Sequence, residues 1–253
     1  MYPAIRLLNR NLTVSLNPEF LIWQLVFPLI YIFVAGFAYT SIIDQVMLGD
    51  KELDYPSFLA TGMIGFNIMN STLISGMIIW NDRRHGMFEQ IMSGPFTRFD
   101  YILANIMAIA LIGIISASLT TGIGFLLFSD FAEFSLLTIP MIVFASIFGA
   151  ILFGSIASII STKISTSEGF NVITNTLFFF FAFTSTTFYP ASKVNDILSV
   201  AFYLNPLTYI VDIIRASIFG VFSEIIFIEM TLLAIISIGF FILATKLLTK
   251  LDF

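Results

Sequence analysis

Long apolar runs separated by short polar segments set the pattern of this chain. Six runs are as long as a bilayer-crossing helix, which needs about 20 mostly apolar residues. Within hydrocarbon every backbone group must be paired inside the segment, which favours helices, and the runs do not alternate as the strands of a membrane barrel do. The pattern therefore predicts an all-α integral membrane protein, a single transmembrane domain over residues 1–253. Its predicted spans are about 20–43, 56–80, 101–128, 135–161, 169–189 and 225–245.

A seventh apolar piece, residues 195–220, is interrupted by Asn205-Pro206. Asn at the cap and Pro at the first helical position favour a helix start there, and Gly220 is a suitable stop. The resulting helix would have about 14 residues, or roughly 21 Å, which is too short to cross a bilayer. It also carries Asp212 and Arg215, which can form an ion pair at i, i+3. We expect a re-entrant or interfacial helical hairpin between the fifth and sixth spans.

The basic residues are distributed unevenly between the two sides that six spans define. Six spans place both termini on one side, together with eight of the eleven basic residues, and the side richer in Lys and Arg is normally the cytoplasm. Seven spans would weaken this bias. We therefore expect a multi-pass protein of the cell (cytoplasmic) membrane with both termini in the cytoplasm. The eight residues are Arg6, Arg10, Arg83, Arg84, Arg98, Lys163, Lys246 and Lys250, and the other three are Lys51, Lys193 and Arg215.

The composition excludes several classes of function. Only 11% of the residues are charged, against about a quarter in a soluble domain, which argues against a soluble protein. The sequence has no basic stripe, which argues against nucleic-acid binding. The sequence has no Walker A pattern, no cysteine and a single histidine, so we expect no enzyme activity and no bound cofactor or metal. The centres of the spans carry no ionisable residue for proton or sodium coupling. If the chain moves a substrate, a cytoplasmic partner must supply the free energy.

Polar residues inside the spans are amides, hydroxyls and small residues. We interpret them first as helix-to-helix contacts. The amides and hydroxyls are Gln24, Asn67, Asn70, Asn105, Asn171, Asn175 and Thr184–Thr187, and a ladder of small residues is Ser146, Ala150, Gly154, Ser158 and Thr162. Thirty phenylalanines suggest either an apolar path or, the interpretation that we favour, lipid-facing side chains.

Residues 81–100 form an island of charge between the second and third spans, with six charged residues and His85. Residues 82–94 can form a short helix that Gly94-Pro95 ends, with an apolar face on one side. Such a segment is either an interfacial loop whose arginines meet lipid phosphates or a helix that docks in a protein groove. The residues of the apolar face are Met87, Phe88, Ile91 and Met92.

Two stretches resemble the permease subunits of type-2 ATP-binding-cassette (ABC) exporters, the family of drug-resistance and polysaccharide-export permeases. RRHGMFEQIMSGPFTR (83–98) is similar to the family's segment after the second span. FYPASKVNDILSVAFYLNPLTYIVDIIR (188–215) is similar to its outer segment, with an aromatic-Pro start and an Asn-Pro-Leu-Thr turn. The layout of six spans after an N-terminal helical lead-in is similar as well.

This resemblance implies a function and two sets of site residues. The chain would be the transmembrane subunit of an exporter for a hydrophobic, lipid-linked or drug-like substrate. Two ATPase subunits would hold ATP and Mg, and a second copy of this permease or a paralogue would complete the transporter within membrane lipid. The expected ATPase-coupling residues are Arg83, Arg84, Gly86, Phe88, Glu89, Ile91 and Met92. The expected outer gate residues are Tyr189, Pro190, Asn205, Pro206, Asp212 and Arg215.

The resemblance also implies that residues 1–18 form an interfacial helix. Ile5, Leu8, Leu12 and Leu16 would be its apolar face, while Arg6 and Arg10 would face headgroups. Two other functions stay open from the residues alone, namely a secondary carrier or channel and a membrane scaffold that transports nothing.

Overall fold

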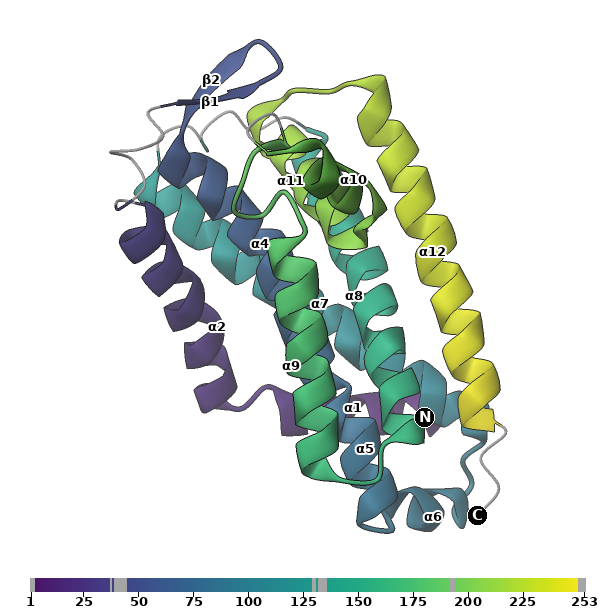
Figure 1. Cartoon of the computed structure of the whole chain (residues 1–253). Helices are drawn as coiled ribbons and strands as arrows, with labels where there is room; N and C mark the ends of the chain where they lie inside the picture. Colours follow the sequence, from purple (N-terminus) through teal and green to yellow (C-terminus); the bar gives the residue numbers. More distant parts are fainter. Residues whose placement is uncertain are drawn as a thin grey trace.

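The computed structural model describes residues 3–36, 38, 45–128, 131, 136–191 and 194–249. In these residues the chain is a helical bundle with one β hairpin (Figure 1). The strands are β1 (Gln45–Leu48) and β2 (Lys51–Asp54). The helices are α1 (Pro3–Ser15), α2 (Pro18–Tyr31), the π-helical turn η1 (Ile32–Gly36), α4 (Tyr55–Ser75), α5 (Met77–Arg84), α6 (Met87–Met92), α7 (Arg98–Leu127), α8 (Thr138–Lys163), α9 (Ser167–Phe183), α10 (Asp196–Leu204), α11 (Pro206–Phe219) and α12 (Glu224–Thr249).

Four stretches of the described chain are long and apolar enough to cross a membrane. They are Tyr55–Arg84, formed by α4 and α5 together, and the helices α7, α8 and α12. Helix α9 has 17 residues and is slightly shorter than a typical span, and the apolar part of the first predicted span covers Leu21–Gly36. Residues 37 and 39–43 of that span lie outside the described residues. The count of six spans therefore stays a prediction.

The α10–α11 segment bends by 84° at Asn205, as the Asn-Pro break indicated. Figure 1 shows both helices in the part of the bundle nearest the β hairpin, between the end of α9 and the start of α12. The segment thus begins and ends toward the same end of the molecule, in agreement with a hairpin that does not cross.

The β hairpin is an element that the sequence analysis did not predict. Strands β1 and β2 pair antiparallel, and the two residues between them are Gly49 and Asp50. Gly49 has a φ of 59°. A positive φ at the first central position alone is typical of a type II′ turn, which suits the twist of a two-residue hairpin. Asp54 then caps α4, since its carboxylate accepts a hydrogen bond from the backbone N–H of Ser57 at 3.1 Å.

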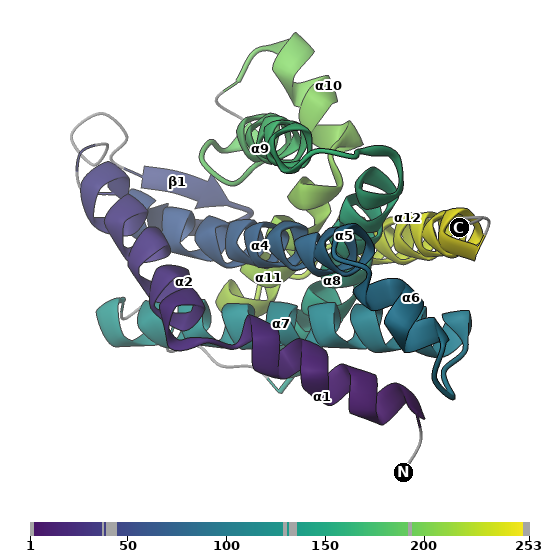
Figure 2. The same ribbon diagram turned by 90° about the horizontal axis from the view of Figure 1, so that it is seen from below.

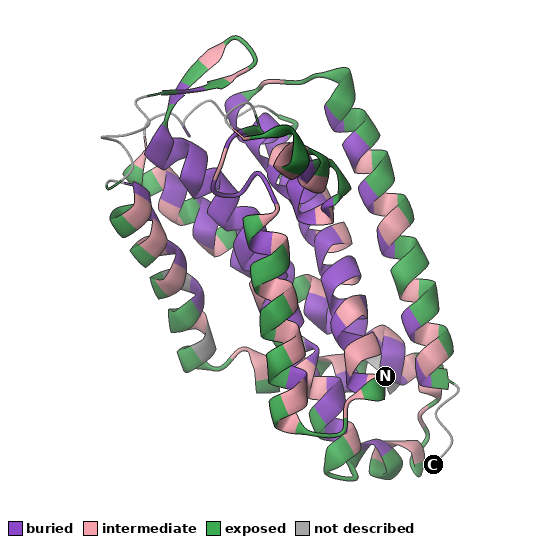
Figure 3. Ribbon diagram, in the orientation of Figure 1, coloured by how far each residue is buried: buried purple, intermediate pink, exposed green. Residues whose placement is uncertain are grey.

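Helices α4, α7, α8 and α11 form the centre of the bundle, and α12 lies at its edge against α8 and α11. About 76% of the apolar window of the α4–α5 stretch is buried, against 22% for α12. Figure 3 shows the same contrast between a buried centre and an exposed α12. Because the outward face of α12 is apolar, its surroundings must be lipid or another membrane protein.

The ladder of small residues on α8 makes a close helix contact, as predicted. A Cβ added to Gly113 of α7 would lie 3.0 Å from the Cβ of Ala150, and one added to Gly154 would lie 2.7 Å from Ile109. Small residues let the two backbones approach, which favours association where no hydrophobic effect drives it.

Helix α1 lies along α7 at the edge of the bundle (Figure 2). Its inward face differs from the predicted one, because Leu7 and Asn11 are buried and Ile5 is 43% exposed. The prediction considered apolar spacing only, whereas the amide of Asn11 reaches a polar partner on α7. Helix α1, α6 and the end of α12 lie at one end of the molecule, which we call the α6 end, and the β hairpin with α10 and α11 lies at the other, the hairpin end.

Candidate functional site

The charged segment at the α6 end is divided between two helices. Residues 82–84 complete α5, and α6 contains only Met87–Met92. Gly86 lies between the helices with a φ of 69°, in the left-handed region that glycine enters without strain. The expected single helix over residues 82–94 is therefore wrong, since the chain turns at Gly86.

Most of the apolar face of α6 is turned toward the chain itself, whereas Met87 is 43% exposed. Phe88 is only 4% exposed, and its ring packs edge-on against Tyr101 of α7 with centroids 5.0 Å apart. Ile91 and Met92 are half-buried against the same cluster. Phe88, which the resemblance places among the coupling residues, is thus covered by the chain itself and is not an exposed anchor for a partner. A six-residue helix places these apolar side chains on one face, but the nearest apolar surface for that face is α7.

A buried polar network joins α5, α7 and α1 behind this cluster. Asp82 is 5% exposed, and its carboxylate accepts a hydrogen bond from the Tyr101 hydroxyl at 2.9 Å. Arg10 of α1 forms an ion pair with the same carboxylate oxygen. The amide of Asn11 donates to Asn105 at 3.0 Å. The network fixes α1 to the base of the bundle, so Arg10 binds Asp82 and does not face headgroups as expected. Removal of the Arg10 charge would leave Asp82 buried without its cation.

At the hairpin end, Asn205 holds the bend between α10 and α11. Its Oδ1 accepts from the backbone N–H of Leu207 at 2.9 Å, and its Nδ2 donates to the carbonyls of Phe181 and Thr184 at 2.7 and 2.8 Å. Helix α11 starts at Pro206 and stops before Gly220, at the positions that the sequence indicated. The side chain of Asn205 thereby ties the hairpin to the end of α9.

Arg215 of α11 is 2% exposed, and its guanidinium contacts a carboxylate, a hydroxyl, two carbonyls and an aromatic ring. It forms the predicted ion pair with Asp212 at 3.1 Å and also donates to Thr61 Oγ1 and to the carbonyls of Phe58 and Thr186 at 3.2 to 3.3 Å. Its guanidinium lies 3.8 Å from the centroid of the Phe58 ring. The residue connects α11 with α4 and with the segment after α9.

The structure thus has a charged segment at the α6 end, a helical hairpin at the other end and apolar helices between them. A family model described as ABC-2 type transporter matches residues 5–219. The chain belongs to the ABC-2 type transporter family. The matched region runs from α1 to the last residue of α11 and thus includes both α6 and the hairpin. A search of curated proteins found no match.

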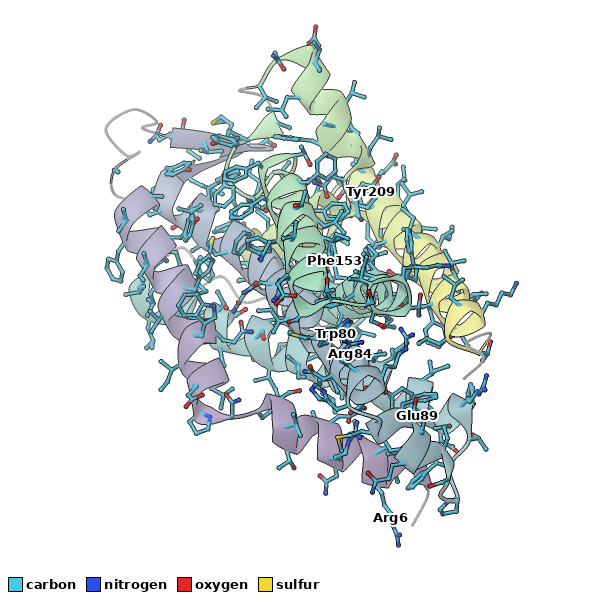
Figure 4. The ribbon with its side chains drawn as sticks, turned by 60° about the horizontal axis from the view of Figure 1, so that its bottom comes forward. Arg6, Trp80, Arg84, Glu89, Phe153 and Tyr209 are labelled. Atoms are coloured by element: carbon cyan, nitrogen blue, oxygen red, sulfur yellow. The ribbon has the colours of Figure 1, made fainter. Side chains whose placement is uncertain are left out.

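Membership of the ABC-2 family makes the chain a permease component of an ABC transporter and implies an associated ABC ATPase. The α6 end offers this ABC-2 permease two open cavities. One, of about 150 Å³, is lined by Trp80, Arg83 and Arg84 beside the end of α8. The other, of about 480 Å³, lies beside α6 and is lined by Glu89 and Phe96 among others. Figure 4 shows Trp80, Arg84 and Glu89 gathered toward this end, with Tyr209 at the other.

The expected coupling residues divide into two groups in the ABC-2 permease. Phe88, Ile91 and Met92 face the bundle, and Arg83 donates to the carbonyl of Ser161 on α8, so these residues position the segment. The others, Arg84, Gly86 and Glu89, are exposed.

The expected gate residues lie together at the hairpin end. Tyr189 is half-buried with its ring 6.3 Å from that of Phe188, and Pro190 lines a cavity with Asp212 and Arg215. A third charged residue of this cavity, Glu229, is not among the expected gate residues. It lies about one turn inside the start of the last predicted span, and a charge at such a position is itself a signal of function.

Proposed function

We propose that the chain is the transmembrane subunit of an ABC exporter. It would move a hydrophobic, lipid-linked or drug-like substrate out of the cytoplasm, with ATP hydrolysis on a separate ATPase subunit in two copies. ATP and Mg would bind to that partner and not to this chain. The observation that carries the proposal is α6, a short helix with an exposed polar face that the bundle holds firmly from behind.

The α6 end is the cytoplasmic end in this proposal. Of the described basic residues, seven lie toward that end and two toward the hairpin end, and basic residues are enriched on the cytoplasmic side. The seven are Arg6, Arg10, Arg83, Arg84, Arg98, Lys163 and Lys246, and the two are Lys51 and Arg215.

Helix α6 transmits force in this proposal because of how it is packed. Glu89 and Gln90 are exposed, and a partner could bind them. Any displacement of the partner would then move a helix whose opposite face packs Phe88 against Tyr101. Tyr101 is bonded to Asp82, and Asp82 to Arg10. Motion of the ATPase would thus move α5, α7 and α1 together, since packed cores shift as units and do not deform continuously.

The face between α4 and α9 supports a second permease copy or a paralogue. A cavity of about 120 Å³ there is lined by four residues with amide or hydroxyl side chains. Amides that face lipid are unfavourable, whereas amides at a helix interface or a substrate path find partners. We assign this face to the contact with the second permease and to the path between the copies. The four polar residues are Asn70, Asn171, Thr174 and Asn175.

The test compares two charge reversals on exposed glutamates at opposite ends. Glu89→Lys changes the outer face of α6, and Glu52→Lys changes β2. We expect Glu89→Lys to lower ATPase affinity roughly tenfold or more, because it places a like or unpaired charge in the contact. Copurification in mild detergent and substrate-stimulated ATP hydrolysis are the measurements.

Glu52→Lys should change neither measurement. If Glu89→Lys retained full ATPase binding and coupling, α6 would not be the docking surface. If wild-type permease brought down no ATPase, the exporter itself would be ruled out.

A further inference from the structure

A cavity of about 310 Å³ lies at the hairpin end, between α11, the start of α12 and the β hairpin. Its walls are largely apolar and include Phe58, Val221 and Ile226. Three charged side chains also line it, namely Asp212, Arg215 and Glu229. An apolar pocket with a few convergent charged groups is the usual form of a small-molecule site.

The charges in this cavity do not cancel. Arg215 neutralises Asp212, with which it forms the ion pair, and Asp212 accepts a further hydrogen bond from Thr186 at 2.8 Å. Three further N–H donors of Arg215 go to Thr61 and to the carbonyls of Phe58 and Thr186. Among the described residues no hydrogen bond joins Arg215 to Glu229, so Glu229 is the carboxyl group of the cavity that lacks a cationic partner.

Glu229 is 8% exposed, and its Oε2 is buried with no hydrogen-bond partner among the residues that the structure describes. A buried carboxylate without a partner is strongly unfavourable, because it has lost its water and gained nothing in return. Such a group in an apolar cavity lacks a cationic donor.

We propose that this cavity binds the primary ammonium group of a ligand with a small apolar body. The ammonium would donate to Glu229 Oε2, and the body would lie against Phe58, Val221 and Ile226. Three N–H donors on a point charge match a carboxylate that lacks partners, and the cavity has room for about one ring beside the ammonium. The site does not rest on the exporter function, since binding needs no ATPase.

The probes are benzylammonium and benzyl alcohol, which share the ring and the methylene and differ in charge. Binding is measured by calorimetry on the purified full chain in maltoside micelles. Benzylammonium should bind, and benzyl alcohol should bind at least about tenfold more weakly. Glu229→Gln preserves the shape of the side chain and should weaken benzylammonium about tenfold or more. Glu224→Gln, the same change on an exposed residue of α12, should leave its affinity unchanged.

Equal binding of the two probes would overturn the proposal, because the cavity would then be an apolar hole with a neutral carboxyl group. Unchanged affinity in Glu229→Gln, or no binding to the wild type, would overturn it as well. The variant Lys193→Met checks the chain's own ammonium, two residues beyond the lining residue Ala191. Binding to this variant but not to the wild type would likewise overturn the ligand site, because Lys193 of the chain would then supply the ammonium.

Two sources supply primary ammonium groups at a membrane surface, free amines and the headgroup of phosphatidylethanolamine. The measurement is repeated with phosphatidylethanolamine added to the micelles, and with phosphatidylglycerol as the control lipid. Competition by the first lipid alone supports the site and identifies a headgroup as its ligand. Equal affinity in both supports the site and identifies a free amine.

Discussion

Single residues show how this chain handles charge inside an apolar body. Arg215, Asp82 and Glu229 are all buried, and the first two are surrounded by partners. Sequence reasoning found the pairing of Arg215 with Asp212, because spacing on one helix is a local property. It did not find the partners of Asp82 or the position of Glu229, because these contacts join residues that are distant in sequence.

Arg215 should be required for stability as well as for the shape of the cavity. Arg215→Met removes the charge and the donors together, leaving the half-buried Asp212 without its cation and the carbonyls of Phe58 and Thr186 without their donor. Breaking a buried pair from one side costs about 3 kcal/mol or more. Thermal unfolding in detergent should show a clear drop in melting temperature.

Arg6→Met is the matched control, because Arg6 is exposed on α1. It should melt like the wild type. Equal melting of Arg215→Met and Arg6→Met would show that the polar contacts of Arg215 add nothing to stability.

At the scale of elements, local signals were accurate and long-range ones were not. Asn205, Pro206 and Gly220 set both ends of α11, since capping and backbone preference act within a few residues. The β hairpin was missed although Gly49-Asp50 is a turn signal, because each strand has only four residues. The sequence pattern identified the apolar face of α6, but such a pattern does not show whether the chain itself or a partner protein covers that face.

Phe88→Ala should loosen α6 in the permease alone. The change removes a buried ring from its contact with Tyr101, and a Phe→Ala change in a core costs about 3 kcal/mol or more. Amide hydrogen exchange over residues 87–92 should become faster in the purified chain without any ATPase. Phe99→Ala, on a ring that is 60% exposed, should leave that exchange unchanged. Slow exchange in both variants would return Phe88 to the role of a partner anchor.

For the whole molecule, the sequence predicted that basic residues gather at one end, and the described helices place them in that way. This distribution follows from the membrane and not from packing, so composition and order along the chain are enough to predict it. The number of spans is a different kind of property. Four helices clearly qualify in the described residues, while α2 and α9 are short, and short helices cross only by adapting to the bilayer or to neighbours.

The orientation can be tested with single cysteines, because the chain has none of its own. Cysteine in place of Ser93 marks the α6 end, cysteine in place of Ser223 marks the hairpin end, and both positions are exposed. An impermeant thiol reagent should label the Ser223 position in intact cells and the Ser93 position only after lysis, because basic ends are retained in the cytoplasm. Cysteines in place of Met1 and Phe253 report the parity of the spans. If the number of spans is even, neither cysteine should be labelled before lysis. Labelling of one of them alone would show that the number of spans is odd. In that case the α10–α11 segment, or another short helix, would have to be counted again as crossing or not crossing the membrane.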